Sequence, residues 1–226
     1  IERWLDGLRV GPQTWNGRRA AVAALFKFCQ RKKLLAEGLT EAERVPKRKV
    51  PSKPVEIFTA EQMRKLLAGI DPTMVPYAVL GAFVGLRPSE AAATTWDLVN
   101  LDEGFVEVVS EHKTGCRFVP LQPVAKAWLE PFRGARLKHM EDGQLCYSGV
   151  VASRKLSLAA RELGIVDEWP EDVLRHSYGS YRLSVIANKA RLAEEMGNSI
   201  AVIDKHYRRP IPPARGIDWF EILPEF

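Results

Sequence analysis

The chain has 226 residues, of which 46% are hydrophobic, and its 33 Lys and Arg residues outnumber its 28 Asp and Glu residues by five. This apolar content suffices for one packed domain and a smaller second one, but no stretch approaches the roughly 18 apolar residues of a membrane span, and no signal-peptide pattern opens the chain. The three cysteines (Cys29, Cys116 and Cys146) fit neither a disulfide framework nor a metal-binding spacing, so we expect a cytoplasmic protein without a cofactor.

The first 45 residues favour a small helical domain. Residues 14–35 have an amphipathic pattern, with an apolar stripe formed by Val22, Leu25, Phe26, Phe28 and Cys29. Because Ile1 is not a natural start, we expect further residues upstream. Between Arg18 and Glu56, eleven Lys and Arg residues stand against four Glu residues, whereas the rest of the chain has a net charge of −2. Such a basic N-terminal segment is typical of a domain that closes around DNA as a clamp, although a solvated helix face with a basic linker explains the charge equally well.

Residues 46–56 form a basic, proline-rich linker that separates residues 1–45 from a second domain at 57–226. Three prolines within residues 46–54 keep this stretch extended. We predict that basic residues of the first domain and the linker contact DNA phosphates, which supplies affinity rather than sequence choice. These residues are Arg18, Arg19, Lys47, Arg48, Lys49 and Lys53.

The second domain is predicted to be mainly helical with a small antiparallel sheet. Thr59 and Gln62 form a capping box for a helix that ends at Gly69. Two further helices are expected, one over about 73–84 and one from Pro88 to about Trp96. Strands at 105–109 and 117–121 predict a hairpin with Lys113 in its turn region. The remaining pattern is helical, at about 123–132, 150–163, 171–187, 189–196 and 199–207.

Four residues of this domain suit one chemistry. Arg87 and Arg175 can grip the non-bridging oxygens of a phosphodiester, Tyr207 can attack the phosphorus, and Lys113 can protonate the leaving oxygen. Each residue also has a purely structural explanation. Arg87 could pair with Glu90, Arg175 could pair with Asp172, Lys113 could be an exposed turn lysine, and Tyr207 could be a packing residue.

The local motifs resemble those of the tyrosine recombinases, the phage-integrase family, over about residues 57–210. Gly85-Leu86-Arg87 with Glu90 matches the first arginine box, and Lys113-Thr114-Gly115 on a hairpin matches the lysine motif. Leu174-Arg175-His176-Ser177 matches the second arginine box. Asn198 and Tyr207 follow at the usual intervals of 23 positions after Arg175 and nine after Asn198. Residues 1–45 resemble the end of the core-binding domain of that family.

The resemblance implies a DNA breaking-rejoining fold and a site-specific recombinase or integrase. Such an enzyme cuts and rejoins double-stranded DNA through a 3′-phosphotyrosyl intermediate without metal or ATP. It also implies a protein that is monomeric in solution, assembles as a tetramer on DNA, and docks its C-terminal tail on a neighbouring protomer; docking of the tail on its own core is the alternative.

Two positions depart from the family pattern, and both are retained as candidate catalytic residues. Asp172 stands where the family usually has histidine, and Asn198 stands where it usually has histidine or tryptophan. Asp172 could accept the Tyr207 proton or orient Arg175, and His176 or His206 could substitute for the missing histidine. A slow enzyme, a catalytically degenerate DNA-binding relative, and a type IB topoisomerase therefore remain as alternatives.

The sequence predicts no metal site, because the histidines do not form a ligand cluster with the cysteines. We therefore expect activity to survive chelation. The histidines are His112, His139, His176 and His206.

Overall fold

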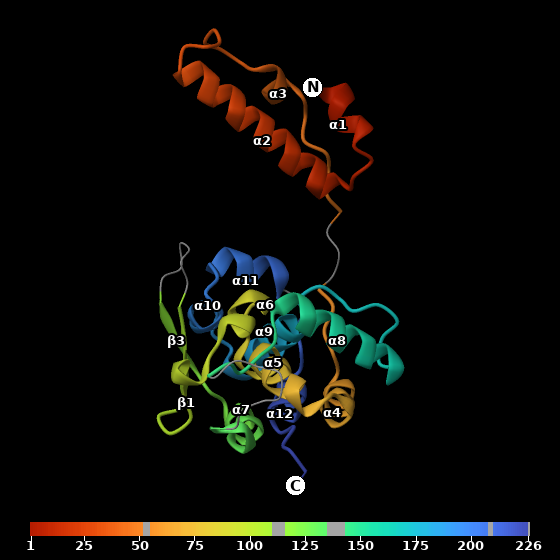
Figure 1. The fold of residues 1–226 in the computed structure, drawn as a ribbon, viewed down its shortest axis with the longest axis vertical. Coiled ribbons are helices and arrows are strands. Elements are labelled where there is room, and N and C mark those ends of the chain that lie inside the picture. The colour runs from red at the N-terminus through yellow and green to blue at the C-terminus, as the bar shows by residue number, and fades with distance from the viewer. Residues whose placement is uncertain (52–54, 110–115, 135–142, 208–209, 226) are drawn as a thin grey trace. The chain divides into compact units, whose positions relative to one another are not determined.

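The computed structural model describes residues 1–51, 55–109, 116–134, 143–207 and 210–225, and its chain divides into two compact units, Ile1–Lys53 and Pro54–Phe226 (Figure 1). Within the described ranges, no helix combines the length and the apolar character that crossing a bilayer requires.

The N-terminal unit contains helices α1 (Glu2–Gly7), α2 (Pro12–Arg31) and α3 (Glu41–Arg44). Its small core consists of Leu5, Trp15 and Val45, and the guanidinium of Arg48 lies 4.4 Å from the centre of the Trp15 ring. The predicted long helix exists, but it begins at Pro12, a residue that suits the first helical position, and ends at Arg31. Helices α1 and α3 were not predicted. Thr40 and Glu43 form a capping box that starts α3.

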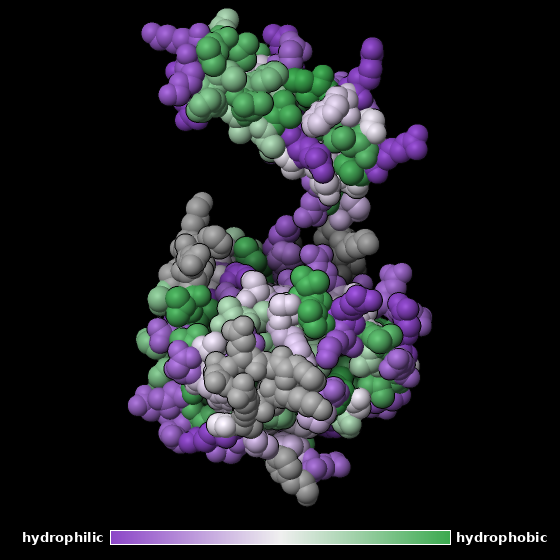
Figure 2. Space-filling view, in the orientation of Figure 1, coloured by the Kyte–Doolittle hydropathy of each residue, from purple (hydrophilic) through white to green (hydrophobic). Residues whose placement is uncertain are grey.

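The apolar stripe predicted for α2 is only partly covered within this unit, where Val22, Phe26 and Cys29 are half-buried. Leu25 and Phe28 are exposed, as are Leu34, Leu35 and Leu39 beyond the end of the helix. Figure 2 shows apolar side chains gathered over this part of the unit. The amphipathic pattern therefore marks a largely apolar surface, whereas the core is formed by Leu5 of α1, Trp15 near the start of α2, and Val45 after α3.

The C-terminal unit begins with helices that lead to the first arginine motif. Helix α4 (Ala60–Gly69) starts at the predicted capping box, where Thr59 and Gln62 exchange hydrogen bonds of 2.9 and 3.1 Å. After a 3₁₀ turn, η1 (Pro72–Met74), the predicted helix at 73–84 consists of α5 (Val75–Val79) and a π-helical segment, η2 (Leu80–Val84). Helix α6 starts at Pro88 as predicted but ends at Ala93 rather than near Trp96, because Thr94 has an extended conformation.

A three-stranded antiparallel sheet follows, in the order β1 (Val99–Asn100), β2 (Phe105–Val108) and β3 (Arg117–Pro120). A 3₁₀ turn, η3 (Trp96–Leu98), precedes β1. Strands β2 and β3 are the predicted hairpin strands, and Val106 pairs with Val119 on its buried face. Strand β1 was not predicted, because its two residues are too few to show a strand periodicity.

Five helices follow the sheet before the tail. They are α7 (Pro123–Leu129) with the 3₁₀ turn η4 (Glu130–Phe132), α8 (Gly149–Glu162), α9 (Val173–Ile186), α10 (Lys189–Met196) and α11 (Ile200–His206), as far as the structure describes the chain. Helix α9 packs on η2, where a Cβ on Gly81 would lie 2.9 Å from the Cβ of Leu174. Because Gly81 has no side chain, α9 can approach η2 closely and bring the two arginine motifs together.

The tail contains a helix, α12 (Pro213–Phe220), that packs against α9 of the same chain. Trp219 is fully buried, its ring stacks on Tyr181 with centres 4.6 Å apart, and its indole N–H donates to the carbonyl of Ala82 at 3.0 Å. Gly216 permits this contact, since a Cβ there would lie 2.3 Å from the hydroxyl of Ser184. The described tail therefore docks on its own core.

Candidate active site

Arg87 is placed by the turn that joins η2 to α6. Gly85 ends the π-helical segment with φ +77, and a Cβ at this position would lie 2.2 Å from the ring of Tyr178. Glycine is therefore required both for the left-handed backbone and for the space. Arg87 then occupies the N-cap position of α6, and its side chain is 34% exposed. This placement leaves the guanidinium within reach of solvent and of a ligand.

Arg175 lies on α9 and is only 5% exposed. Its guanidinium donates to the carbonyl of Gly85 and, at 2.7 Å, to the carbonyl of Met196. Burial, together with the nearby charge of Arg87, lowers the pKa of Arg175 to about 10, so it stays charged at neutral pH. The predicted alternative of a salt bridge with Asp172 is wrong, because Arg175 lies beside the carboxylate of Glu90, at 3.8 Å.

The C-terminus of α10 holds three arginines through main-chain carbonyls. Arg87 donates to the carbonyl of Gly197 at 2.8 Å, Arg175 donates to that of Met196, and Arg117 donates to that of Glu195 at 3.3 Å. The last carbonyls of a helix lack partners within the helix and carry partial negative charge, so they favour cations. This helix end fixes the orientation of both arginines of the predicted site.

Glu90 is the carboxylate at the centre of this cluster. It accepts hydrogen bonds from the backbone N–H and the guanidinium of Arg87, both at 2.8 Å, and two more from Arg117, at 3.0 and 2.9 Å. Burial works to raise the pKa of Glu90, but the hydrogen bonds from Arg117 and Arg87 outweigh it and lower the pKa to about 2. One negative charge thus faces three guanidiniums, and the cluster keeps a positive surplus that suits an anion.

Arg117 was not among the predicted site residues. Its position at the start of an apolar strand, where a charged side chain needs a buried partner, is the signal that could have identified it. Gly197 has φ +61 and leaves room for this arginine, since a Cβ there would lie 2.9 Å from the Arg117 guanidinium.

Tyr207 follows α11 and is buried against α9. A Cβ on Gly179 would lie 2.6 Å from the Tyr207 ring, so this glycine makes space for the phenol. Its hydroxyl lies 3.2 Å from Nδ1 of His176. Burial raises the pKa of Tyr207 to about 12, and the charge of Arg175 opposes the rise. The phenol is therefore protonated at neutral pH, and it interacts electrostatically with Arg175.

The two departures from the family pattern both lie at the cluster. The side-chain oxygen of Asn198 accepts a hydrogen bond of 2.8 Å from Arg87. Asp172 is the N-cap residue of α9 with a left-handed backbone, φ 51, which aspartate adopts more readily than most residues. Its negative charge acts on both His176 and Tyr207. The structure therefore brings Arg87, Arg175, Asn198 and Tyr207 to one place, with Asp172 nearby.

Lys113 and the turn that carries it lie outside the described residues, so its assignment stays a prediction. Lys53, one of the predicted DNA-binding residues, also lies outside them. Among the described residues, no group of three or more His, Cys, Asp or Glu side chains could hold a metal ion.

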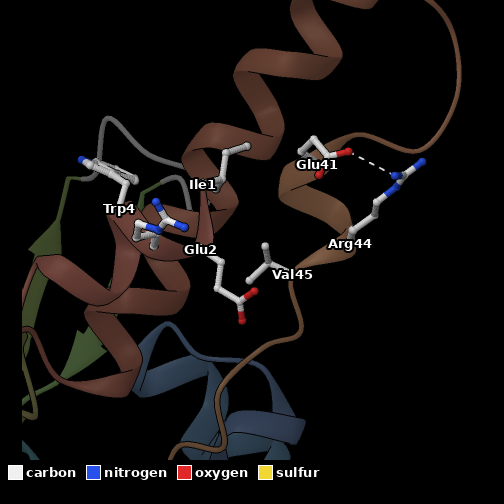
Figure 3. Close-up of a pocket in the computed structure, with 7 residues that line it drawn as sticks. Ile1, Glu2, Trp4, Glu41, Arg44 and Val45 are labelled. Atoms are coloured by element: carbon white, nitrogen blue, oxygen red, sulfur yellow. Dashed lines mark hydrogen bonds and ion pairs between the residues drawn. The ribbon is translucent and has the colours of Figure 1, made fainter.

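The other predicted DNA-binding residues lie in the N-terminal unit. Arg18, Lys47 and Lys49 are exposed, and Arg48 is exposed and paired with Asp6. Arg19 instead donates to the carbonyls of Val45 and Glu43, so it holds the chain around α3. A pocket of this unit, lined by Ile1, Glu2, Arg3, Trp4, Glu41, Arg44 and Val45, contains none of the five (Figure 3).

The sequence comparison identifies curated relatives of known class. No protein-family model matches the chain. Over 205 residues, 84% of the chain, it is 25% identical to tyrosine recombinase XerC of Xanthomonas campestris pv. campestris (strain B100). The resemblance to the tyrosine recombinases is confirmed. The chain spans 62% of the length of this recombinase.

Solved structures of recombinases and integrases share the fold. A crystal structure of XerA recombinase matches the whole chain and 83% of its own length, with a TM-score of 0.60 and 19% identity. The Tn1549 transposon integrase, in complex with transposon right end DNA, matches 95% of the chain and 82% of its own length, with a TM-score of 0.70 and 16% identity. The predicted fold, mainly helical with a small antiparallel sheet and preceded by a small helical unit, is confirmed.

Proposed function

We propose that this chain is the catalytic part of a site-specific DNA recombinase or integrase, preceded by part of a core-binding domain at residues 1–45. The observation that carries the proposal is the convergence of Arg87, Arg175 and Tyr207 around the end of α10. The similarity to XerC and the DNA-bound integrase neighbour support DNA as the substrate. The reaction would take place in the cytoplasm, with a free monomer and a tetramer on DNA.

The two arginines are suited to hold a phosphodiester. Arg87 has five N–H donors and uses three of them on Glu90, Gly197 and Asn198 within the described part of the chain. Arg175 uses two, on Gly85 and Met196. The remaining donors, already oriented by these contacts, can stabilise the charge that builds on the non-bridging oxygens during attack.

The reaction then follows from the placement of Tyr207. Its oxygen attacks the phosphorus and forms a 3′-phosphotyrosyl bond while the 5′ oxygen leaves with a proton, which we assign to Lys113. The new ester keeps the phosphodiester linkage, so attack by the 5′ hydroxyl of a second strand reverses the step and rejoins the DNA without ATP.

Covalent trapping tests this proposal. The protein is incubated in EDTA with nicked duplexes whose cleaved fragment diffuses away, and a denaturation-resistant protein–DNA adduct is measured. We expect an adduct with the wild-type chain and none with Tyr207→Phe, which should still bind DNA. An equal adduct in Tyr207→Phe, or none in the wild type on any duplex from a random pool, would refute the proposal. Cleavage at many unrelated sites by the monomer would instead identify a topoisomerase.

A further inference from the structure

His176 is hydrogen-bonded to the residue that we propose as the nucleophile. It follows Arg175 on α9, and its Nδ1 lies 3.2 Å from the Tyr207 hydroxyl. The centres of the two rings are 6.0 Å apart. A proton acceptor must lie within about 2.6–3.2 Å of the proton donor, and His176 meets this condition before any substrate is bound.

The surroundings of His176 suit a proton acceptor. Burial lowers its pKa, and the charges of His206 and Arg175 lower it further, whereas Asp172 raises it. A histidine with a lowered pKa is neutral near pH 7 and has a free lone pair on one ring nitrogen. In the tautomer with hydrogen on Nε2, that lone pair lies on Nδ1 and faces Tyr207.

Tyr207 needs such an acceptor, because burial raises the pKa of its hydroxyl to about 12. A phenol of this kind does not ionise at neutral pH and attacks well only if its proton is removed as the bond to phosphorus forms. The family usually has a histidine at position 172, where this chain has aspartate.

We propose that His176 is the general base for Tyr207 and that Asp172 is a positioning residue that stabilises the resulting imidazolium. This proposal rests on the proposed recombinase function. As the Tyr207 oxygen bonds to phosphorus and the bond from phosphorus to the 5′ oxygen breaks, the phenol proton moves to Nδ1 of His176. The leaving oxygen takes a separate proton from the general acid. When the strand is rejoined, His176 returns its proton to the Tyr207 oxygen.

Neither neighbouring group fits the role as well. His206 is exposed, and its ring stacks on that of His176 with centres 6.1 Å apart. Nδ1 of His176, in contrast, lies within hydrogen-bond distance of the Tyr207 hydroxyl. Asp172 acts on Tyr207 through its charge, which raises the pKa of the phenol.

The test measures single-turnover cleavage of the nicked duplexes as a function of pH, with DNA affinity and thermal melting recorded for each variant. His176→Asn keeps a polar atom near the Nδ1 position but cannot take the proton, and it should cleave about a hundredfold to ten-thousandfold more slowly with unchanged DNA affinity. His206→Asn is the matched control and should keep the wild-type rate at the pH plateau.

The pH profile separates a base from a structural residue. Cleavage by the wild-type chain should rise with pH through the pKa of His176, below the usual value of about 6.5. Asp172→Asn removes the charge that raises this pKa, so the rise should move to lower pH. His206→Asn removes a charge that lowers it, so the rise should move to higher pH. If His176→Asn does not fold, the opposite shifts of the pH–rate profile in Asp172→Asn and His206→Asn test whether His176 is the base. The absence of these shifts would overturn the proposal.

A duplex with sulfur in place of the leaving 5′ oxygen separates the base from the acid. The thiolate leaves without a proton, so this substrate should restore cleavage by Lys113→Ala but not by His176→Asn. Restoration of both variants would assign His176 to the leaving group and overturn the proposal.

An adduct that needs Tyr207 but forms at the wild-type rate in His176→Asn would overturn this inference alone. The absence of any Tyr207-dependent adduct in the wild type would overturn the proposed function as well.

Discussion

Glu90 accepts two hydrogen bonds from the guanidinium of Arg117, at 3.0 and 2.9 Å. The same carboxylate holds the guanidinium of Arg87 from the other side, at 2.8 Å. The orientation of a predicted catalytic arginine therefore depends on a carboxylate that is itself fixed by a second arginine on the sheet.

Glu90 should make stability depend on acid pH. Its pKa falls from 4.5 to about 2 on folding. At a pH above the pKa of the unfolded state, this shift stabilises the folded protein by about 3 kcal/mol. The contribution is lost as the pH falls from 4.5 towards 2. Glu90→Gln should be less stable than the wild type at neutral pH, and denaturant unfolding at several pH values should show the difference shrinking over that range. A constant difference would contradict the assignment.

Arg117→Lys should slow adduct formation without abolishing DNA binding. A lysine cannot make the two parallel hydrogen bonds to Glu90, so Arg87 loses part of its support, and we expect a fall of about tenfold to a hundredfold in cleavage rate. Arg133→Lys is the control, because Arg133 pairs with Asp102 at the surface, where such a pair contributes little. Equal rates in both variants would show that Arg117 has no part in the site.

Gly179→Ala should displace Tyr207. The added Cβ would lie 2.6 Å from the ring and 2.9 Å from the hydroxyl, so the phenol must move. We expect a loss of about 1–3 kcal/mol of stability from overpacking. Adduct formation should fall by at least about tenfold, because the Tyr207 oxygen is no longer aligned for in-line attack on the phosphorus. Gly17→Ala, in α2, has nothing within 4 Å of the new Cβ and should keep adduct formation and gain stability. Adduct formation by Gly179→Ala at the wild-type rate would contradict the placement of Tyr207.

Trp219→Ala should destabilise the C-terminal unit by about 3–5 kcal/mol, because a fully buried indole and its hydrogen bond to Ala82 are lost. Ile217→Ala, on the exposed side of the same helix, should change stability by less than about 0.5 kcal/mol. Thermal melting should also be independent of protein concentration, since the tail docks on its own chain. A melting temperature that rises with concentration would point to docking on another copy.

Several elements of the fold could be predicted because local signals agree there with the tertiary structure. Helix α10 has the predicted bounds, and α4 begins at its capping box. The errors occur where such signals are missing. Strand β1 is too short for a periodicity, and α12 lies in a proline-rich tail whose apolar residues fit several structures. The π-helical segment η2 depends on packing against α9, which no pattern in its own residues reveals.

The site was predictable only in part, for a physical reason. Arg87, Arg175 and Tyr207 could be proposed from their motifs, and the structure places them together. Their partners could not, because they are contributed by distant elements. Arg117 comes from the sheet, the carbonyls come from the end of α10, and the contact between His176 and Tyr207 joins α9 to the residue that follows α11.

The three arginines at the end of α10 are held by carbonyl groups, which every amino acid possesses. Substitutions at positions 195 and 196 that preserve the helix would leave those acceptors in place, so these hydrogen bonds to Arg117 and Arg175 do not depend on which side chains stand there. What cannot change freely is the path of the backbone, which turns at Gly197 in a left-handed conformation beside Arg117. A comparison of side-chain identities alone would overlook the end of α10, whose carbonyl groups orient the three arginines.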